Sequence, residues 1–200
     1  ISVYHSAPNK NGRIQGIDNA LKASHNIFKT ACLHVLRGAF EAVTAYSMRW
    51  NYKHSDYFMV LSPSYIKVFE EFVGIHPAKK LIVQTNPITI DTRSFSFDQQ
   101  KKQKEIIFVG RLDPTLKKVK RIIDIWNLLA SSNPDWRLTI IGDGPDRSFL
   151  ENYVQELNLK RVSFEGFQNP VEYYKRASIL MLTSDFEGFP LVLPECMSCG

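Results

Sequence analysis

The sequence is poor in cysteine and has no long apolar run. Its 200 residues include three cysteines, and so odd and sparse a number argues against a disulfide framework and fits a reducing cytosol. Because no stretch of about 18 apolar residues is present, the sequence predicts no membrane-spanning helix. The apolar fraction of 44% is ordinary for a globular protein.

Motifs for two common site types are incomplete. Cys196 and Cys199 have the spacing of zinc ligands, but no second pair and no nearby histidine completes a site, which favours packing within a helix. The Gly142-x-Gly144 pair stands alone, and no G-x-G-x-x-G opens the first strand–helix turn. A dinucleotide-dependent dehydrogenase is therefore disfavoured.

The net positive charge lies in the first half of the chain. Residues 1–95 carry 11 basic residues (Lys and Arg) and 6 acidic residues (Asp and Glu), whereas residues 96–200 carry 14 basic and 14 acidic residues. Aromatic residues accompany the basic ones between Lys22 and Lys53. A basic, aromatic helical region makes an anionic membrane surface a candidate partner. The alternative is a core-facing apolar stripe with a solvated basic face. No motif for nucleic acid accompanies the charge, so we expect no nucleic-acid partner.

Strand and helix patterns follow one another along the chain. Strands are predicted at residues 1–5, 57–61, 80–84, 105–109, 136–141, 161–165 and 178–182. Helices are predicted at residues 17–52 with a break near Gly38, and at 62–72, 118–131, 146–157, 170–176 and from 194. This alternation indicates parallel sheets with right-handed crossovers.

Several polar or flexible residues follow predicted strands. Arg111, Gly142 to Gly144, Phe167 and Glu187 all lie just beyond a strand. In open parallel sheets, ligands bind beyond the carboxyl ends of the strands. We therefore expect these residues to converge on one ligand-binding edge of a sheet.

The segment from Glu187 to Glu195 is the most informative of the chain. It places two carboxylates eight positions apart around a Gly-Phe-Pro turn, after the apolar run 179–182, which is predicted to be a buried strand. Proline is favoured in the first turn of a helix, so a helix is expected to start near Pro194. The free N–H groups of a helix start attract phosphate. This pattern suggests one acid facing a sugar and the other facing a ribose.

The same segment resembles the Glu-x7-Glu signature of retaining glycosyltransferases of family 4, which have the two-domain GT-B fold. Further matches to that family's C-terminal domain lie in the right order, at Phe108–Asp113, Ile140–Pro145 and Val162–Phe167. The resemblance covers residues 80–200 well and residues 1–79 loosely.

The resemblance implies an α/β fold of the GT-B type, with Rossmann-like parallel sheets covered by helices on both faces. Residues 1–90 are expected to form the C-terminal part of an acceptor-side domain, and residues 105–200 a truncated nucleotide-sugar domain. The polar segment 91–104 has weak periodicity and is predicted to be the linker. We therefore expect the chain to be a fragment.

By resemblance, the expected activity is transfer of a hexose from a UDP- or GDP-sugar to a glycan or glycolipid acceptor, with retention of configuration. No Asp-x-Asp motif is present, and the fold class neutralises the diphosphate with protein cations, so no metal or other cofactor is expected. A cytoplasmic location, including the cytoplasmic face of a membrane, is expected. Two alternatives stay open: a sugar-nucleotide epimerase or phosphorylase, and a non-catalytic nucleotide-sugar binding subunit.

The resemblance assigns the anion-binding residues. Lys117 follows Arg111 at the spacing of the family's phosphate-binding pair, and Gly110 precedes them in the donor-binding loop. Cations placed there stabilise the charge that develops on a leaving nucleoside diphosphate. The alternative is that Lys117 belongs to a solvated basic helix start.

The two acids and the turn between them are expected at the donor. By resemblance, Glu187 lies near the donor sugar and Glu195 binds the ribose hydroxyls. The backbone N–H groups of Phe189 and Leu191 also face the donor, whereas Pro190 has none to give. The alternative for either acid is a surface or helix-capping role.

Three further residues carry less specific expectations. Gln168 stands where the family contacts the nucleobase, largely through its backbone, and it is equally an ordinary turn residue. His5 ends a predicted strand where the family places a functional histidine, and a structural role is the alternative. Lys118 replaces a glycine common in the family, which is expected to affect the shape of its loop.

Overall fold

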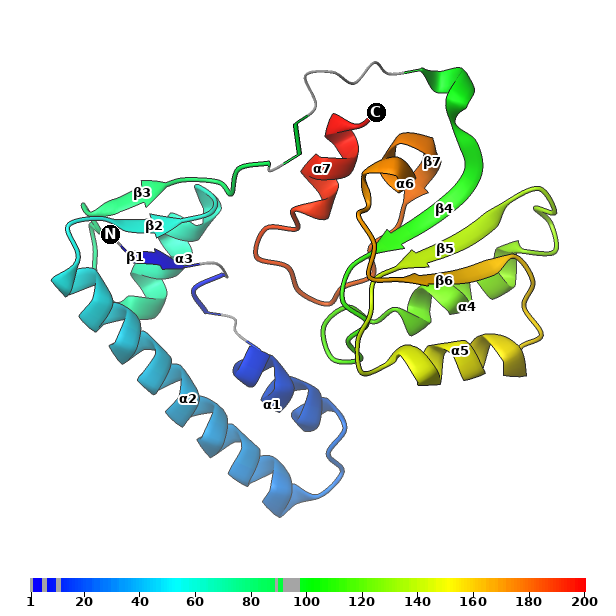
Figure 1. Cartoon of the computed structure of the whole chain (residues 1–200). Helices are drawn as coiled ribbons and strands as arrows, with labels where there is room; N and C mark the ends of the chain where they lie inside the picture. The colour runs from blue at the N-terminus through cyan, green and yellow to red at the C-terminus, as the bar shows by residue number, and fades with distance from the viewer. Residues whose placement is uncertain (1, 5–6, 10–11, 89, 92–97) are drawn as a thin grey trace. The chain divides into compact units, whose positions relative to one another are not determined.

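This computed structural model describes residues 2–4, 7–9, 12–88, 90–91 and 98–200. The chain divides into two compact units, Ile1–Pro87 and Ile88–Gly200 (Figure 1). Each unit contains a parallel sheet and its own buried apolar core.

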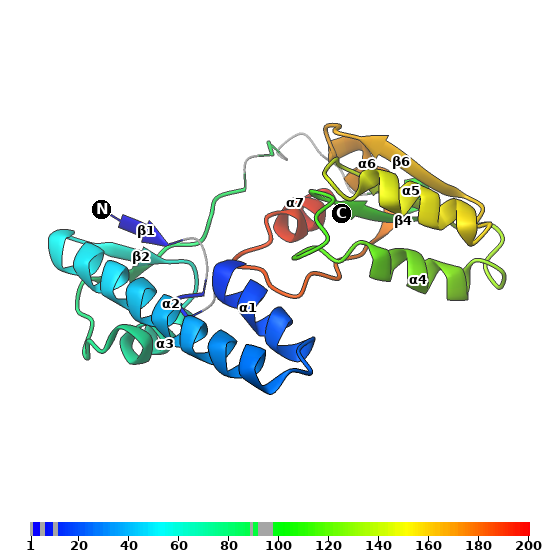
Figure 2. The same ribbon diagram turned by 90° about the horizontal axis from the view of Figure 1, so that it is seen from below.

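The first unit is built on three parallel strands in the order β1-β2-β3. The strands are β1 (Ser2–Tyr4), β2 (Phe58–Val60) and β3 (Leu81–Val83), and the helices are α1 (Gly12–Lys22), α2 (Ile27–His54) and α3 (Ser64–Val73). Phe58 and Val60 point to the same face of β2, because side chains alternate along a strand. Helices α2 and α3 cover that face and complete the core (Figure 2).

The predicted helix break near Gly38 is wrong. Helix α2 runs from Ile27 to His54 straight through Gly38, and the interruption lies at residues 23–26. Asn26 begins α2 as its N-cap, and its side chain accepts a hydrogen bond from the amide of Lys29 at 3.1 Å. A capping asparagine is thus the real boundary signal, whereas one glycine costs a helix interior only about 1 kcal/mol.

The second unit contains four parallel strands in the order β6-β5-β4-β7. The strands are β4 (Gln103–Val109), β5 (Arg137–Ile141), β6 (Val162–Gly166) and β7 (Ala177–Leu180). The helices are α4 (Lys120–Leu129), α5 (Arg147–Glu156), α6 (Val171–Arg176) and α7 (Val192–Ser198), with a short 3-10 helix η1 (Gln99–Lys101) before β4.

Helices cover both faces of this second sheet (Figure 1). Along β4, Ile106 and Phe108 pack into a core with α4 and α5, whereas Ile107 and Val109 pack on the opposite face beside α6 and α7. The continuous apolar run of β4 is therefore explained by burial on both faces, which is typical of a strand in a parallel sheet.

The prediction that the run 179–182 is a buried strand is only partly right. Strand β7 covers Ala177–Leu180 and pairs with β4 alone among the described strands. It is therefore an edge strand, and Ile179 is 42% exposed. An apolar run does not distinguish an edge from a central position when its periodicity is the only signal.

One ionised residue is buried at the start of β4. The side chain of Glu105 has no exposed area, and it pairs with Arg176 at 2.8 Å and Arg137 at 3.1 Å. The hydroxyl of Thr139 donates a further hydrogen bond to it at 2.6 Å. Burial alone raises the pKa of Glu105, but the hydrogen bonds from its three partners outweigh burial and lower the pKa to about 2.

The carboxyl ends of β4 and β5 meet in a contact that only glycine allows. Gly142 has φ +132°, and a Cβ on it would lie 1.9 Å from the carbonyl oxygen of Gly110. A Cβ on Gly144 would lie 2.4 Å from the carbonyl oxygen of Leu112. The obstacles are backbone atoms, so no side-chain movement relieves the overlap.

We expect Glu105 to make the second unit pH-sensitive in acid. Its pKa is lower in the folded protein than its ordinary value of 4.5. Its contribution, about 3 kcal/mol, is therefore complete above pH 4.5 and is lost as the pH falls toward 2. Urea unfolding between pH 2 and 6 measures this slope. Glu105→Gln is expected to be less stable and to lose most of the slope, and an unchanged slope in the variant contradicts the assignment.

We expect Gly142→Ala to destabilise the second unit by at least about 3 kcal/mol, because it adds an atom inside a backbone contact at positive φ. The matched control is Gly38→Ala in α2, where a Cβ meets no atom within 4 Å. That control is expected to stabilise the first unit by about 0.5–1 kcal/mol. Urea unfolding measures both, and equal effects would show that the contact is unimportant.

Candidate functional site

A cavity of about 540 Å³ opens at the carboxyl edge of the second sheet. Its walls come from the loops after β4, β5 and β6 and include Gly110, Arg111, Gly142 to Gly144, Phe167 and Gln168. The structure therefore brings together the residues that sequence reasoning placed after these three strands. The volume lies in the range of small-molecule sites, which is about 300–1,000 Å³.

Backbone hydrogen bonds tie the three loops together. The amide of Gly110 donates to the carbonyl of Ile141 at 3.0 Å, and the amide of Gly142 donates to the carbonyl of Gly166 at 2.7 Å. Beyond the strands, the amide of Leu112 donates to the carbonyl of Asp143 at 3.0 Å. The cavity walls are thus fixed by main-chain contacts, independently of any side chain that faces a ligand.

Lys117 and Glu187 form an ion pair beside this cavity. The ammonium of Lys117 lies 2.6 Å from a carboxylate oxygen of Glu187, and each side chain is about a quarter exposed. The hydrocarbon stem of Lys117 lies next to Gly110, since a Cβ there would be 3.9 Å from the Cε of Lys117. Glu187 itself is not among the lining residues, and Lys117 connects it to them.

Two residues that sequence reasoning missed hold the segment after β7 against the loop after β4. The hydroxyl of Thr183 donates to the carbonyls of Lys117 and Lys118 at 3.2 and 3.0 Å. The amide of Asp185 donates to the carbonyl of Leu116 at 3.0 Å, and its carboxylate pairs with Arg121 at 2.6 Å. No local pattern marks Thr183 or Asp185, because their partners lie more than 60 residues away.

Lys118 occupies a backbone conformation that suits the glycine common in the family at this position. Lys118 has φ +51°, in the left-handed region that glycine adopts most easily. The family's common glycine fits this conformation, and here a lysine occupies it. Its ammonium lies 3.9 Å from the carboxylate of Asp185, so the side chain faces the segment after β7.

Glu195 has a different partner from Glu187. The hydroxyl of Tyr174 donates to a carboxylate oxygen of Glu195 at 3.1 Å. Tyr174 is fully buried, and burial together with the negative charge of Glu195 raises the pKa of Tyr174. The phenol therefore remains a neutral donor. Sequence reasoning missed Tyr174, which looks like an ordinary core residue of α6.

The remaining predicted residues lie elsewhere. Phe189, Pro190 and Leu191 are half-buried in the connection before α7 and do not line the cavity. Helix α7 begins at Val192, so the predicted start near Pro194 is late, although Pro194 still lies in the first turn. His5 lies outside the described residues.

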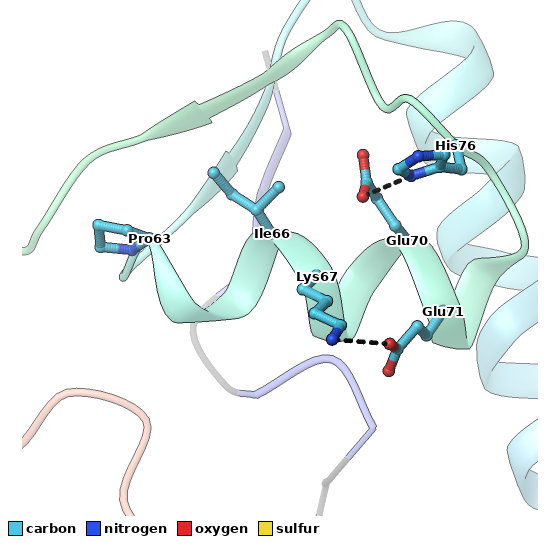
Figure 3. Close-up of a pocket in the computed structure, with 6 residues that line it drawn as sticks. All are labelled: Pro63, Ile66, Lys67, Glu70, Glu71 and His76. Atoms are coloured by element: carbon cyan, nitrogen blue, oxygen red, sulfur yellow. Dashed lines mark hydrogen bonds and ion pairs between the residues drawn. The ribbon is translucent and has the colours of Figure 1, made fainter.

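A second cavity of about 550 Å³ lies beside α3 in the first unit (Figure 3). Glu70 accepts hydrogen bonds at 2.8 Å from the amide of Ala78 and from the ring of His76. These hydrogen bonds lower the pKa of Glu70, so it stays ionised. Glu70 thereby fixes the connection from α3 to β3, and this structural role accounts for its contacts.

Metal ligands and reactive thiols are scarce in the described part of the chain. Within it, no three His, Cys, Asp or Glu side chains are grouped to hold a metal ion. Cys196 and Cys199 are free, and burial raises the pKa of both thiols. Cys199 belongs to the core between the sheet and α7. The expectation that no metal is required stays a prediction.

Comparison with known proteins identifies the family. The model of the family described as glycosyl transferases group 1 matches residues 89–200, more than half of the chain. The protein belongs to this family. It is 35% identical over 153 residues to lipopolysaccharide 1,6-galactosyltransferase of Salmonella typhimurium. The matched region covers 74% of this chain and 42% of the relative. The chain thus spans about two fifths of that relative's length.

Solved structures agree on the fold. The apo form of the lipopolysaccharide outer core galactosyltransferase WaaB is 30% identical, with a TM-score of 0.54 over 74% of this chain and 42% of that one. The pneumococcal O-GlcNAc transferase GtfA in complex with UDP and GlcNAc is 20% identical, with a TM-score of 0.65 over 76% of this chain and 30% of that one. The expected α/β fold of the GT-B type is confirmed.

Proposed function

We propose that the protein is a retaining glycosyltransferase that moves a hexose from a UDP- or GDP-sugar to a glycan or glycolipid acceptor. The observation that carries the proposal is the cavity after β4, β5 and β6, with Arg111 in its wall and the Lys117–Glu187 pair beside it. Similarity to a lipopolysaccharide galactosyltransferase supports the hexose and the glycolipid class of acceptor. The resemblance of the Glu187–Glu195 segment to the family 4 signature supports retention.

The cations act on the leaving group. As the glycosidic bond breaks, negative charge develops on the nucleoside diphosphate, and Arg111 and Lys117 stabilise it. Before the donor binds, Lys117 is neutralised by Glu187 at 2.6 Å. A bound diphosphate takes over Lys117, and the carboxylate of Glu187 becomes available to a sugar hydroxyl or to the cationic transition state.

The other proposed donor contacts are supported by the resemblance to family 4 together with the local hydrogen bonds. Glu195 accepts the vicinal ribose hydroxyls, because the single phenol hydrogen bond from Tyr174 leaves oxygen lone pairs for them. Gln168 faces the base from the cavity wall. The resemblance alone supports the assignment of the Phe189 and Leu191 amides to the donor sugar, since neither residue lines the cavity. As the bond from the anomeric carbon to the phosphate breaks, the acceptor oxygen bonds to that carbon on the same face. An oxygen of the departing diphosphate takes the acceptor proton, and attack on that face gives retention.

We expect calorimetric titration with UDP, GDP and ADP to show binding of one nucleotide in preference to the others. Glu195→Ala is expected to weaken that nucleotide roughly ten- to hundredfold, because a charged hydrogen bond to the ribose is lost. Glu172→Ala is the matched control, since Glu172 is an exposed acid of α6 paired only with Lys175 among the described residues. No nucleotide binding by the parent protein, or equal losses in both variants, contradicts the proposal.

We further propose that the first unit contacts an anionic membrane surface. Helix α2 exposes Phe28 at 88%, and Tyr46 and Trp50 are also exposed, in the half of the chain that carries the positive charge. Aromatic and basic side chains together bind the interface of anionic lipid. No helix in the described residues is long and apolar enough to cross a bilayer.

Flotation with vesicles tests this contact. We expect more protein on vesicles of phosphatidylcholine mixed with phosphatidylglycerol than on phosphatidylcholine alone, because anionic lipid attracts basic residues. Trp50→Ser is expected to reduce the bound fraction severalfold. Phe149→Ser, at an exposed aromatic of α5 in the second unit, is the matched control. An equal bound fraction of the protein on the two lipid compositions contradicts the proposal.

A further inference from the structure

The segment 183–187 follows β7 and has no helix or strand of its own. It carries Glu187, whose carboxylate lies 2.6 Å from the ammonium of Lys117. Connecting segments are generally more mobile than helices and strands, whereas a carboxylate that meets a substrate needs a fixed position. The contacts that hold this segment therefore determine where Glu187 lies.

Asp185 holds the segment through both its backbone and its side chain. Its amide donates to the carbonyl of Leu116 at 3.0 Å. One carboxylate oxygen pairs with the guanidinium of Arg121 at 2.6 Å, and the other lies 3.9 Å from the ammonium of Lys118. Arg121 also donates to the carbonyl of Thr183 at 3.1 Å. The segment is thus attached to the loop after β4 and to α4 at two of its residues.

The carboxylate of Asp185 is partly shielded from water. Its side chain is 26% exposed, and that of Lys118 is 28% exposed. Fully solvated ion pairs are easily exchanged, whereas a shielded carboxylate between two cations is held in one place. Lys118 reaches Asp185 from a left-handed backbone conformation that glycine adopts at lower cost. A lysine at such a position indicates that its side chain has a use there.

The partners of Asp185 differ in place from the partner of Glu187. The stem of Lys117 lies beside Gly110, which lines the cavity. Arg121 does not line the cavity and pairs with Asp185 instead. In the proposed function, a bound diphosphate takes over the ammonium of Lys117, and Glu187 loses the ion pair that holds it in the free protein. The contacts of Asp185 do not use that ammonium, so they persist.

We propose that Asp185 is a positioning residue that keeps Glu187 at the donor sugar once a diphosphate has taken over Lys117. The inference rests on the proposed function. Asp185 acts through the backbone, because it fixes the chain two residues before Glu187 and touches no ligand itself. Its loss therefore weakens the contact to the sugar and leaves the contacts to the nucleotide unchanged.

Hydrogen exchange of the segment 183–187 tests the positioning role without a ligand. Lys117→Gln removes the ion pair to Glu187, as a bound diphosphate does. We expect this variant to keep most of the protection of the segment. The double variant of Lys117→Gln with Asp185→Asn is expected to exchange at least about tenfold faster, because the second attachment is lost as well. Equal protection in the single and double variants overturns the proposal.

Calorimetry compares UDP-galactose with UDP, and GDP-mannose with GDP. Asp185→Asn is expected to weaken the sugar nucleotide that the parent protein binds by roughly three- to tenfold, and to change the matching nucleotide by less than about twofold. A purely structural defect weakens both ligands alike. Asp124→Asn is the matched control, because it removes another acid that pairs with a lysine of α4, Lys120, at 2.9 Å.

A double-mutant cycle tests whether Asp185 acts through Glu187. In a Glu187→Gln protein the carboxylate that contacts the sugar is already absent. Asp185→Asn is therefore expected to cause no further loss of affinity for the sugar nucleotide, because the two substitutions remove the same contact. A full additional loss in the double variant overturns the proposal.

The outcomes separate this inference from the proposed function. If the parent protein binds a nucleotide and Asp185→Asn weakens the nucleotide and its sugar derivative equally, or weakens neither, the positioning role is wrong and the donor site stands. If Glu187→Gln leaves the sugar nucleotide unaffected, there is no contact to position and the inference fails. If the parent protein binds no nucleotide at all, the proposed function fails and this inference fails with it.

Discussion

The candidate site depends on one backbone contact, between Gly142 and Gly110. Two parallel strands end side by side, and their first loop residues approach so closely that a Cβ on Gly142 would lie 1.9 Å from the carbonyl oxygen of Gly110. This approach lets the amide of Leu112 reach the carbonyl of Asp143. Arg111, between Gly110 and the buried Leu112, is thereby fixed at the cavity wall. A side chain at Gly142 would separate the loops and with them the charged residues that they carry.

The two ends of the second sheet differ in how their charged side chains are paired. At the start of β4, Glu105 is buried and held by Arg137 and Arg176, so its negative charge is compensated within the protein. At the carboxyl end, Arg111 is exposed, and Lys117 has a single carboxylate partner in the described residues. The first arrangement stabilises the fold. At the carboxyl end, Arg111 and Lys117 remain able to bind an anionic ligand. Before the ligand arrives, the pair with Glu187 reduces the free-energy cost of the partly buried charge on Lys117.

Whether sequence reasoning found a site residue depended mainly on how far along the chain its contact partners lie. Residues that follow strands, such as Arg111 and Phe167, were placed correctly at one edge because strand ends meet in any parallel sheet. Tyr174 and Thr183 were missed because their roles arise from contacts 21 and more than 60 residues away. The break near Gly38 was misplaced for a local reason: the cap at Asn26 is a stronger boundary signal than one glycine.

The two acids of the Glu-x7-Glu signature, Glu187 and Glu195, have different partners. Glu187 is paired with the cation Lys117, so a ligand must exchange with an existing ion pair to reach it. Glu195 is held by a neutral phenol, and the raised pKa of Tyr174 keeps that phenol protonated. A neutral donor orients a carboxylate without cancelling its charge. In the proposed reaction Glu195 thus suits a lasting contact with ribose hydroxyls, and Glu187 suits a contact made only when a diphosphate claims Lys117.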